Sequence, residues 1–218
     1  MTFTRDDFSG MPPEWVASRL KAAPCTLLPN GYIRTCPVRL SFFNAFELPP
    51  KRGSIEPKWG GNLLFPAGAD LSLLHAKVKA LETLKWPNAH STDPRKRVKL
   101  HSPFKDGADM LKYDGYHEGQ TFITASSQNK CPVVERPRVK GAAPEIIIDK
   151  DRVYPGVWAI CTINLYSYDK EKKGVAFGLQ STMLLADDQP FGAGSPTVKD
   201  EYDDLDLGLD FVDDDLAF

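Results

Sequence analysis

The sequence predicts a mainly β fold: a small Greek-key barrel of short strands, with one helix between strands and long inserted loops. Proline accounts for 18 of the 218 residues, which favours loops and short strands over a helical bundle. Apolar residues alternate in several short runs, as they do in half-buried strands. The one convincing helical pattern stands between two such runs.

Residues 1–35 are expected to form an irregular N-terminal extension. Its one predicted element is a short helix at Glu14–Ala22, because proline favours the first helical turn and Pro12–Pro13 precede it. The first strand is expected at residues 38–46. One face of that strand would carry its apolar residues, namely Val38, Leu40, Phe42 and Phe46.

A basic loop at Leu48–Gly61 precedes a short strand at Asn62–Phe65. The helix follows at Asp70–Trp86, with Asp70 as its cap and Pro87 after its end. Its apolar stripe recurs at steps of three or four residues, through Leu71, Leu74, Val78, Leu81 and Leu84. We interpret the stripe as core packing against a sheet, the alternative being a face that binds a partner.

The later strands are expected at residues 120–126 and 133–140, and then in a long hairpin. Pro155–Gly156 introduces a strand at 157–168, a turn follows at 169–173, and residues 174–185 return antiparallel. Among small Greek-key barrels the OB fold is the natural candidate. We place this domain at residues 36–192 and a flexible, disordered acidic tail at 193–218.

Charge is distributed very unevenly along the chain. The formal net charge is −2, from 27 bases and 29 acids. Nine of the acids lie in residues 200–218, which contain no Lys or Arg, so residues 1–199 carry a formal charge of +7. A basic body with an acidic tail points to a nucleic-acid partner, the alternative being a solubilising tail on an unrelated enzyme.

Several other classes lack their signatures. The four cysteines and four histidines show no zinc-site spacing, and no phosphate-binding glycine motif is present, so we expect no metal and no cofactor. No apolar stretch is long enough to span a bilayer, and the start of the chain does not read as a signal peptide. The expected location is the cytoplasm.

The outer face of the strand at 157–168 suits unpaired bases. Aromatic rings alternate there with hydrogen-bonding groups, and bases stack on such platforms. The stacking candidates are Trp158, Tyr166 and Tyr168, with Trp59 and Phe122 from other segments. Any of these rings could instead pack beneath a loop, and Phe122 is the one most expected in the core.

Phosphate contacts are expected from cations on several loops. Runs of like charge usually mean only solvated loops, but several of them in a body of charge +7 favour nucleic acid. The candidates are Arg95, Lys96, Arg97, Lys99, Lys105, Lys58, Arg136, Arg138, Lys140, Lys172 and Lys173. No recognition helix stands out, so binding without sequence preference is expected.

The chain resembles the phage OB-fold single-stranded DNA-binding proteins over about Val38–Gly192 and the tail. The matching motifs occur in the family's order: Val38–Ser41, Phe46–Glu47, Thr121–Ser127, Tyr154, Gly156, Tyr168, Lys173–Val175, Gly178–Leu179 and Asp188–Gly192. Two positions depart from the pattern: Thr124 stands where Asn is usual, and Gln180–Ser181 where paired Asn is common. The resemblance implies an OB fold and a role in DNA replication, recombination or repair in the infected host cell.

The tail is also similar to the acidic C-terminal segments of bacterial and T7-like phage single-stranded DNA-binding proteins. Apolar residues are spaced among its acids, and it closes with Asp213, Asp214, Asp215, Leu216, Ala217 and Phe218. An aromatic ring beside a free carboxylate suits a pocket with a basic rim. The resemblance implies that the tail recruits replication or recombination proteins, with Asp213–Asp215 and Phe218 as its contacts.

We therefore expect a non-enzymatic single-stranded DNA-binding protein that acts without metal or nucleotide hydrolysis. The rival is a nuclease-like enzyme in which Asp106, Asp109 and Asp114 hold Mg²⁺. A DNA-mimic inhibitor is disfavoured because the body is basic. Self-association is left open.

Overall fold

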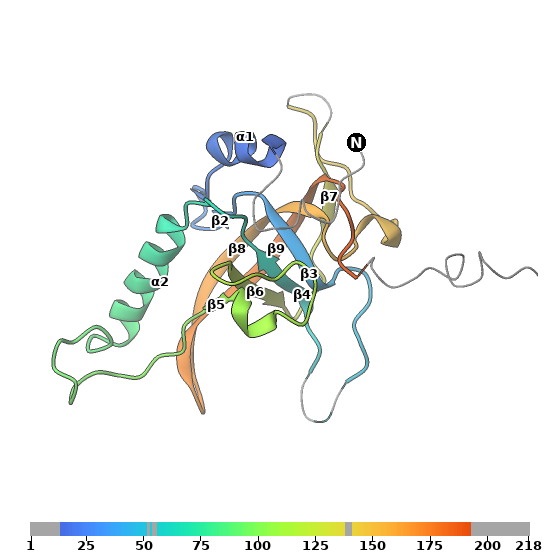
Figure 1. Cartoon of the computed structure of the whole chain (residues 1–218). Coiled ribbons are helices and arrows are strands. Elements are labelled where there is room, and N and C mark those ends of the chain that lie inside the picture. Colours follow the sequence, from blue (N-terminus) through green and yellow to red (C-terminus); the bar gives the residue numbers. More distant parts are fainter. Residues whose placement is uncertain (1–13, 52, 54–55, 138–140, 193–218) are drawn as a thin grey trace, which may run out of the picture.

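The computed structural model describes residues 14–51, 53, 56–137 and 141–192. Its centre is a closed five-stranded barrel (Figure 1). The barrel strands are β3 (Val38–Asn44), β4 (Trp59–Leu64), β6 (Thr121–Ser127), β8 (Trp158–Asp169) and β9 (Lys173–Ala186). All neighbours are antiparallel except β6 and β9, and β8 returns to β3 to close the ring. This is the strand order of an OB fold, and it confirms the predicted fold class.

Shorter strands extend the sheet at two edges. β1 (Thr26–Leu27) pairs with β2 (Ile33–Arg34), and β2 pairs with β8. At the other edge, β7 (Val133–Glu135) runs parallel to the far end of β9. The predicted helix α1 (Glu14–Ala22) is confirmed, but residues 26–34 also contain strand, which the expectation of an irregular extension missed.

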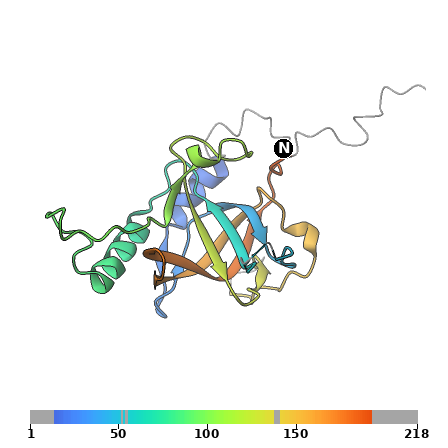
Figure 2. The ribbon, with the colours of Figure 1, turned by 90° about the horizontal axis from the view of Figure 1, so that it is seen from below.

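A long insertion connects β4 to β6. It contains helix α2 (Ser72–Lys85), strand β5 (Phe104–Asp106) and the short 3₁₀ helix η2 (Gly107–Met110). Another short 3₁₀ helix, η3 (Lys150–Arg152), precedes β8. In Figures 1 and 2, α2 lies to one side of the barrel, and the segment after it runs back along the helix to β5.

Helix α2 buries a face slightly different from the predicted stripe. Leu74, Val78 and Glu82, which follow one another at steps of four residues, are its buried side chains. Leu84 is 76% exposed, so its expected place in the core is wrong: the helix turns that position away from the buried row. Asp70 is not the cap, because Leu71 takes the N-cap position, but Asp70 does accept a hydrogen bond from the Ser72 backbone N–H, at 2.9 Å.

The inner face of the hairpin is apolar. Val157, Ala159, Cys161 and Ile163 are each 0–1% exposed. They join one core with residues of every other barrel strand and of α2. Burial raises the pKa of the Cys161 thiol to about 12, so this thiol stays neutral and behaves as a small apolar side chain. The core holds the barrel rigid beneath the surfaces described below.

Strand β3 carries a bulge that changes the direction of Phe42. The register between β3 and β4 shifts between Ser41 and Asn44, and Phe42 has a φ of 48°. Gly61 lies opposite, where a Cβ atom would approach the Phe42 carbonyl oxygen to 2.3 Å. Only glycine allows this close approach. The expectation that Phe42 shares one face with Val38 and Leu40 is wrong, because the bulge breaks the alternation and leaves it 51% exposed.

None of the described helices is long and apolar enough to cross a membrane.

Candidate nucleic-acid interface

The outer face of β4 and β6 is the first surface to consider. OB folds bind oligonucleotides on their second and third barrel strands and on the loops between strands one and two and between strands four and five. In this chain those strands are β4 and β6, and the loops are residues 45–58 and 170–172. The topology therefore selects this face before any side chain is considered.

A hydrogen-bonded row of polar side chains crosses that face. Asn62 and Thr124 are cross-strand partners, and the Thr124 hydroxyl donates to Asn62 Oδ1 at 2.8 Å. Lys105 Nζ donates to Thr124 Oγ1 at 3.1 Å. Asn62 Nδ2 donates to the Tyr116 hydroxyl at 2.8 Å. Because Thr124 and Lys105 are exposed, the row offers solvent a fixed cation and a hydroxyl.

Two exposed aromatic rings lie at the edge of the same face. Phe42 is 51% exposed and Tyr113 is 38% exposed, and their rings meet edge to face with centroids 4.9 Å apart. Lys112 Nζ lies 4.9 Å from the centroid of the Tyr113 ring. A non-glycine residue at positive φ costs about 1–2 kcal/mol, and such strain concentrates at functional sites. The pair offers ring surface beside a cation, which is what a base and its phosphate require.

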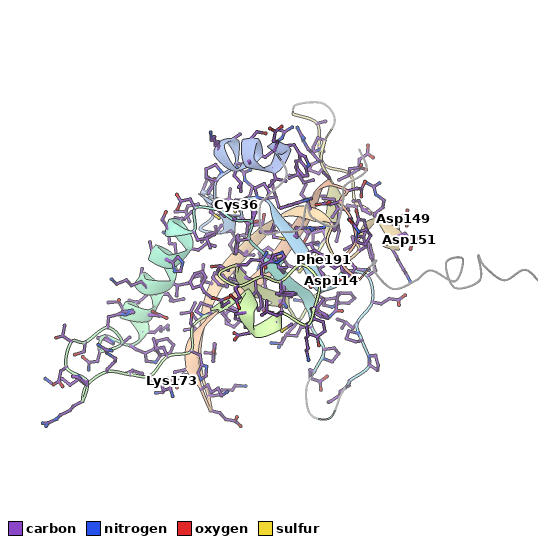
Figure 3. All side chains as sticks on the ribbon, viewed as in Figure 1. Cys36, Asp114, Asp149, Asp151, Lys173 and Phe191 are labelled. Carbon is purple, nitrogen blue, oxygen red and sulfur yellow. The ribbon has the colours of Figure 1, made fainter. Side chains whose placement is uncertain are left out.

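The turn that carries Tyr113 is fixed by the segment just before the tail. The Gly192 backbone N–H donates to Asp114 Oδ2 at 2.9 Å. The Phe191 ring lies against Gly115 so closely that a Cβ atom there would be 2.2 Å from it. Figure 3 shows Phe191 and Asp114 together at the centre of the molecule. The last described residue, Gly192, is therefore held one residue away from Tyr113.

Arg39 anchors this segment from below. Its side chain donates to the carbonyl oxygens of Gly156 at 2.8 Å and Gln189 at 2.6 Å, and its Nη2 lies 3.5 Å from Asp188 Oδ2. Its guanidinium also lies 4.2 Å from the centroid of the Phe191 ring. Burial lowers the Arg39 pKa to about 10, which leaves the guanidinium charged at neutral pH. The charged Arg39 guanidinium therefore binds groups inside the fold.

Two of the predicted stacking residues are buried. Trp158 is 2% exposed, and its Nε1 donates to Asp188 Oδ2 at 2.7 Å. Its expected place on an open face is wrong because residues 187–192 fold back over that end of β8. Phe122 is also 2% exposed, beneath Tyr116 and Met110. Neither ring is open to a base in this structure.

The other three predicted rings are more accessible, and the two on β8 lie apart from the Phe42–Tyr113 pair. Tyr166 is 39% exposed, and Tyr168 is half-buried against Gly174. Both are on β8, which is two strands away from β4 and from β6 in the barrel. Trp59 is half-buried, with Lys130 Nζ 5.5 Å from its ring centroid. β8 thus forms a second aromatic surface.

Most of the predicted cations are brought to one end of the molecule. Arg95, Lys96, Arg97 and Lys99 are exposed on the segment that leads from α2 into β5, where Lys105 follows. The hairpin tip with Lys172 and Lys173 joins them, because the His101 backbone N–H donates to the Lys173 carbonyl at 2.9 Å. Figure 3 labels Lys173 at this end.

Other predicted contacts lie elsewhere or outside the described residues. Lys58 is exposed beside Trp59, at the opposite end of β4 from the Leu64–Phe122 pair. Arg136 is exposed just after β7, which pairs with the end of β9 far from the hairpin tip. The predictions for Arg138, Lys140, Asp213, Asp214, Asp215 and Phe218 fall outside the described residues.

Two acids of the rival nuclease hypothesis, Asp106 and Asp114, hold backbone groups. Asp106 Oδ1 accepts from the N–H groups of Ala108 at 2.8 Å and Gly119 at 3.1 Å, and Asp114 binds Gly192. No group of three or more His, Cys, Asp or Glu residues in the described part of the chain could hold a metal ion. These acids stabilise turns.

Sequence reasoning missed Phe42, Tyr113, Lys112 and Asn62. The sequence places Phe42 on the apolar face of its strand, and Tyr113 and Lys112 lie in a polar loop without a regular pattern. One signal was available: Gly60 and Gly61 are adjacent within a strand, and glycine in a strand often marks a bulge. The position of the bulge in the partner strand was not visible in the sequence.

Comparison with known proteins agrees with this architecture. Residues 32–212 match the model of a family described as Enterobacter phage Enc34, ssDNA-binding protein. The chain is 27% identical over 176 residues to putative protein p50 of Acyrthosiphon pisum secondary endosymbiont phage 1, across 78% of this chain and 91% of that protein.

Two solved structures share the fold. The single-stranded DNA-binding protein from bacteriophage Enc34, in complex with single-stranded DNA, aligns with a TM-score of 0.59 and 23% identity, over 78% of this chain and 98% of that one. The single-stranded DNA-binding protein encoded by bacteriophage T7 aligns with a TM-score of 0.50 and 14% identity, over 82% of this chain and 96% of that one.

Proposed function

This chain belongs to the Enc34 family of phage single-stranded DNA-binding proteins, and we propose that it binds single-stranded DNA without sequence preference. Bases stack on exposed aromatic rings, and lysine and arginine side chains neutralise the phosphates. The observation that carries this proposal is the exposed Phe42–Tyr113 pair, next to Lys105 and the Asn62–Thr124 row on the β4–β6 face. The matched family and the two solved structures are named for binding single-stranded DNA, which supports a binding role over an enzymatic one.

Two sets of cations have different roles in this proposal. Lys105 and Lys112 lie beside the aromatic pair and the polar row, so they meet the phosphates of stacked nucleotides. The exposed cations of residues 95–99 and of the hairpin tip attract the strand over a longer range. Contacts of this kind give affinity without reading the bases.

The testing experiment compares equal lengths of single- and double-stranded DNA over a salt series. We expect preference for the single strand, because a duplex hides the base faces on which stacking depends. The logarithm of the affinity should fall linearly with the logarithm of salt concentration, with a slope of about −0.7 for each phosphate contact. Fluorescence anisotropy measures both. Equal affinity for duplex at moderate salt would reject the proposal.

We propose further that the acidic tail competes with DNA and recruits replication or recombination proteins. Gly192 is held next to Asp114 and near Tyr113, so the tail is attached beside the proposed stacking rings. Nine carboxylates attached there act at high effective concentration on the cations of the DNA surface. Phe218 and Asp213–Asp215 are the proposed contacts for the partner protein.

Deleting residues 200–218 is expected to tighten single-strand binding, most at low salt. Screening acts over about 10 Å at 0.1 M salt, so the competition weakens as salt rises. The matched control keeps the tail length but replaces its nine acids with Asn and Gln, and it should bind DNA as tightly as the deletion. Unchanged or weaker binding after deletion, with the body folded, would refute the competition.

A single substitution separates the two roles of the tail. Phe218→Ala changes no charge, so DNA affinity should stay within about twofold, whereas capture of a replication protein such as the polymerase should be lost. Surface plasmon resonance against purified candidate partners measures that capture. Capture that survives the substitution would leave the tail without a recruiting role for Phe218.

A further inference from the structure

A cavity lies between α2 and the segment that returns to β5. Its volume is about 530 Å³, within the range of ligand pockets. Val78 and Ala89 form part of its apolar wall, while the side chains of Lys79, Arg97 and Lys99 supply positive charge from both sides. Glu82 also lines it, but this carboxylate is paired with His90 Nε2 at 3.0 Å. Three cations thus face one carboxylate, so the cavity wall carries a net positive charge.

Two stacked rings line the cavity. His75 of α2 and Phe104 of β5 lie with ring centroids 4.0 Å apart and ring planes 28° from parallel. Phe104 also meets Phe177 of the core edge to face, at 5.8 Å. The stack is anchored from the core side, and His75 is its exposed member. An exposed planar ring on a fixed base is a platform on which a nucleobase can stack.

The cavity and the β4–β6 face lie on the two sides of the short strand β5, which pairs with β6. Successive side chains of a strand point to opposite sides, and here Lys105 contacts Thr124 on the barrel face while the next residue back, Phe104, lines the cavity. A single DNA strand that passes Lys105 and crosses β5 would therefore reach the cavity one residue further back, at Phe104. Arg97 and Lys99 precede β5 on the same segment.

We infer that the insertion between β4 and β6 carries a second subsite for the same single strand. One base enters the cavity and stacks on His75, and its flanking phosphates pair with Lys79, Arg97 and Lys99. This inference rests on the proposed function. The subsite lengthens the stretch of DNA that the protein contacts beyond the barrel. Oligonucleotides long enough to reach the cavity should therefore gain affinity that the barrel face alone does not give.

The test uses the full chain and oligothymidylates of about 4 and about 16 nucleotides, the range of site sizes reported for OB folds. His75→Ala and the double variant R97A/K99A should lower affinity for the long oligonucleotide by about fivefold or more, the equivalent of one lost stacking contact. For His75→Ala, affinity for the short one, which the barrel face can accommodate alone, should change less than twofold. R97A/K99A also removes two of the cations that attract DNA over a longer range, so it should lower affinity for the short one too, but by a smaller factor than for the long one. Anisotropy titrations measure both.

The matched control is R19A/K21A on α1. It removes one Arg and one Lys at the same spacing from an exposed helix away from the cavity, so it should leave both affinities unchanged. Thermal unfolding of each variant confirms that it is folded. If the cavity variants lose affinity equally at both lengths, or behave like the control, the subsite is rejected.

Two further outcomes would also reject the DNA subsite. If a peptide of residues 200–218 binds the tail-deleted protein, and R97A/K99A abolishes that binding without affecting long DNA, the cavity belongs to the tail and the DNA subsite is rejected. If the wild-type protein binds neither oligonucleotide, the proposed function fails, and this inference fails with it. A length-dependent loss confined to the cavity variants supports the subsite.

Discussion

Replacing Trp158 by alanine is expected to lower the free energy of unfolding by about 3–5 kcal/mol, the usual cost of removing a buried tryptophan. The ring is 2% exposed, meets Trp15 edge to face at 5.7 Å, and donates to Asp188. The substitution also leaves Asp188 with one partner fewer beside Arg39. Chemical denaturation followed by circular dichroism measures the change.

The control for this prediction is Tyr166→Ala on the same strand. Tyr166 is 39% exposed, so its loss should change the free energy of unfolding by much less, about 0.5 kcal/mol. A Trp158→Ala protein that remains as stable as the wild type but loses DNA binding would contradict the burial argument. It would return Trp158 to the stacking surface.

The second large effect is expected at Phe42. Phe42→Gly should weaken single-strand binding by about 1–3 kcal/mol, or about 5- to 150-fold, through loss of one stacking ring. Stability should be unchanged or slightly higher, because glycine adopts a φ of 48° without the strain that a side chain imposes. Affinity and stability would then move independently, which a merely structural role for the ring does not predict.

Two companion variants make the result specific. Phe42→Ala removes the ring but keeps the backbone strain, so it should lose as much affinity without the gain in stability. Tyr166→Ala removes a comparably exposed ring from β8 and should have little effect on DNA binding. A larger loss for Tyr166 than for Phe42 would assign the DNA to the β8 surface instead.

The predictability of the fold followed the regularity of each element. The long hairpin was predicted closely, because alternating apolar residues and the preceding Pro155–Gly156 determine it locally. Helix α1 was predicted from Pro12–Pro13, which precede its first turn. Strands β1 and β2 were missed: with two residues each, they have no period to detect and depend on β8 for their partners. Leu84 shows the limit for helices, since the helical period was correct but the face that is buried depended on tertiary packing.

The candidate site was less predictable for a related reason. The exposed cations near β5 and the hairpin tip could be identified as runs of charge, but which runs lie together depends on the pairing of β5 with β6 and of His101 with Lys173. Trp158 was expected on an open face and is buried, whereas Phe42 was expected on the apolar face of its strand and is exposed. Trp158 is covered by a segment distant in sequence, and Phe42 is turned outward by a bulge. Neither cause can be detected from the alternation of residues along one strand.

Closure of the barrel has a consequence for how the chain reaches its native state. The bonds that join β3 to the entrance of β8 link residues as far apart as Arg39 and Gly156, which are separated by 117 positions. Contacts of such long range make folding slow, because chain entropy is lost before the contacts form. During synthesis, the edge of β3 that pairs with β8 therefore stays unpaired until the C-terminal hairpin has been made. Chains that stop before β8 should aggregate instead of folding to a smaller domain.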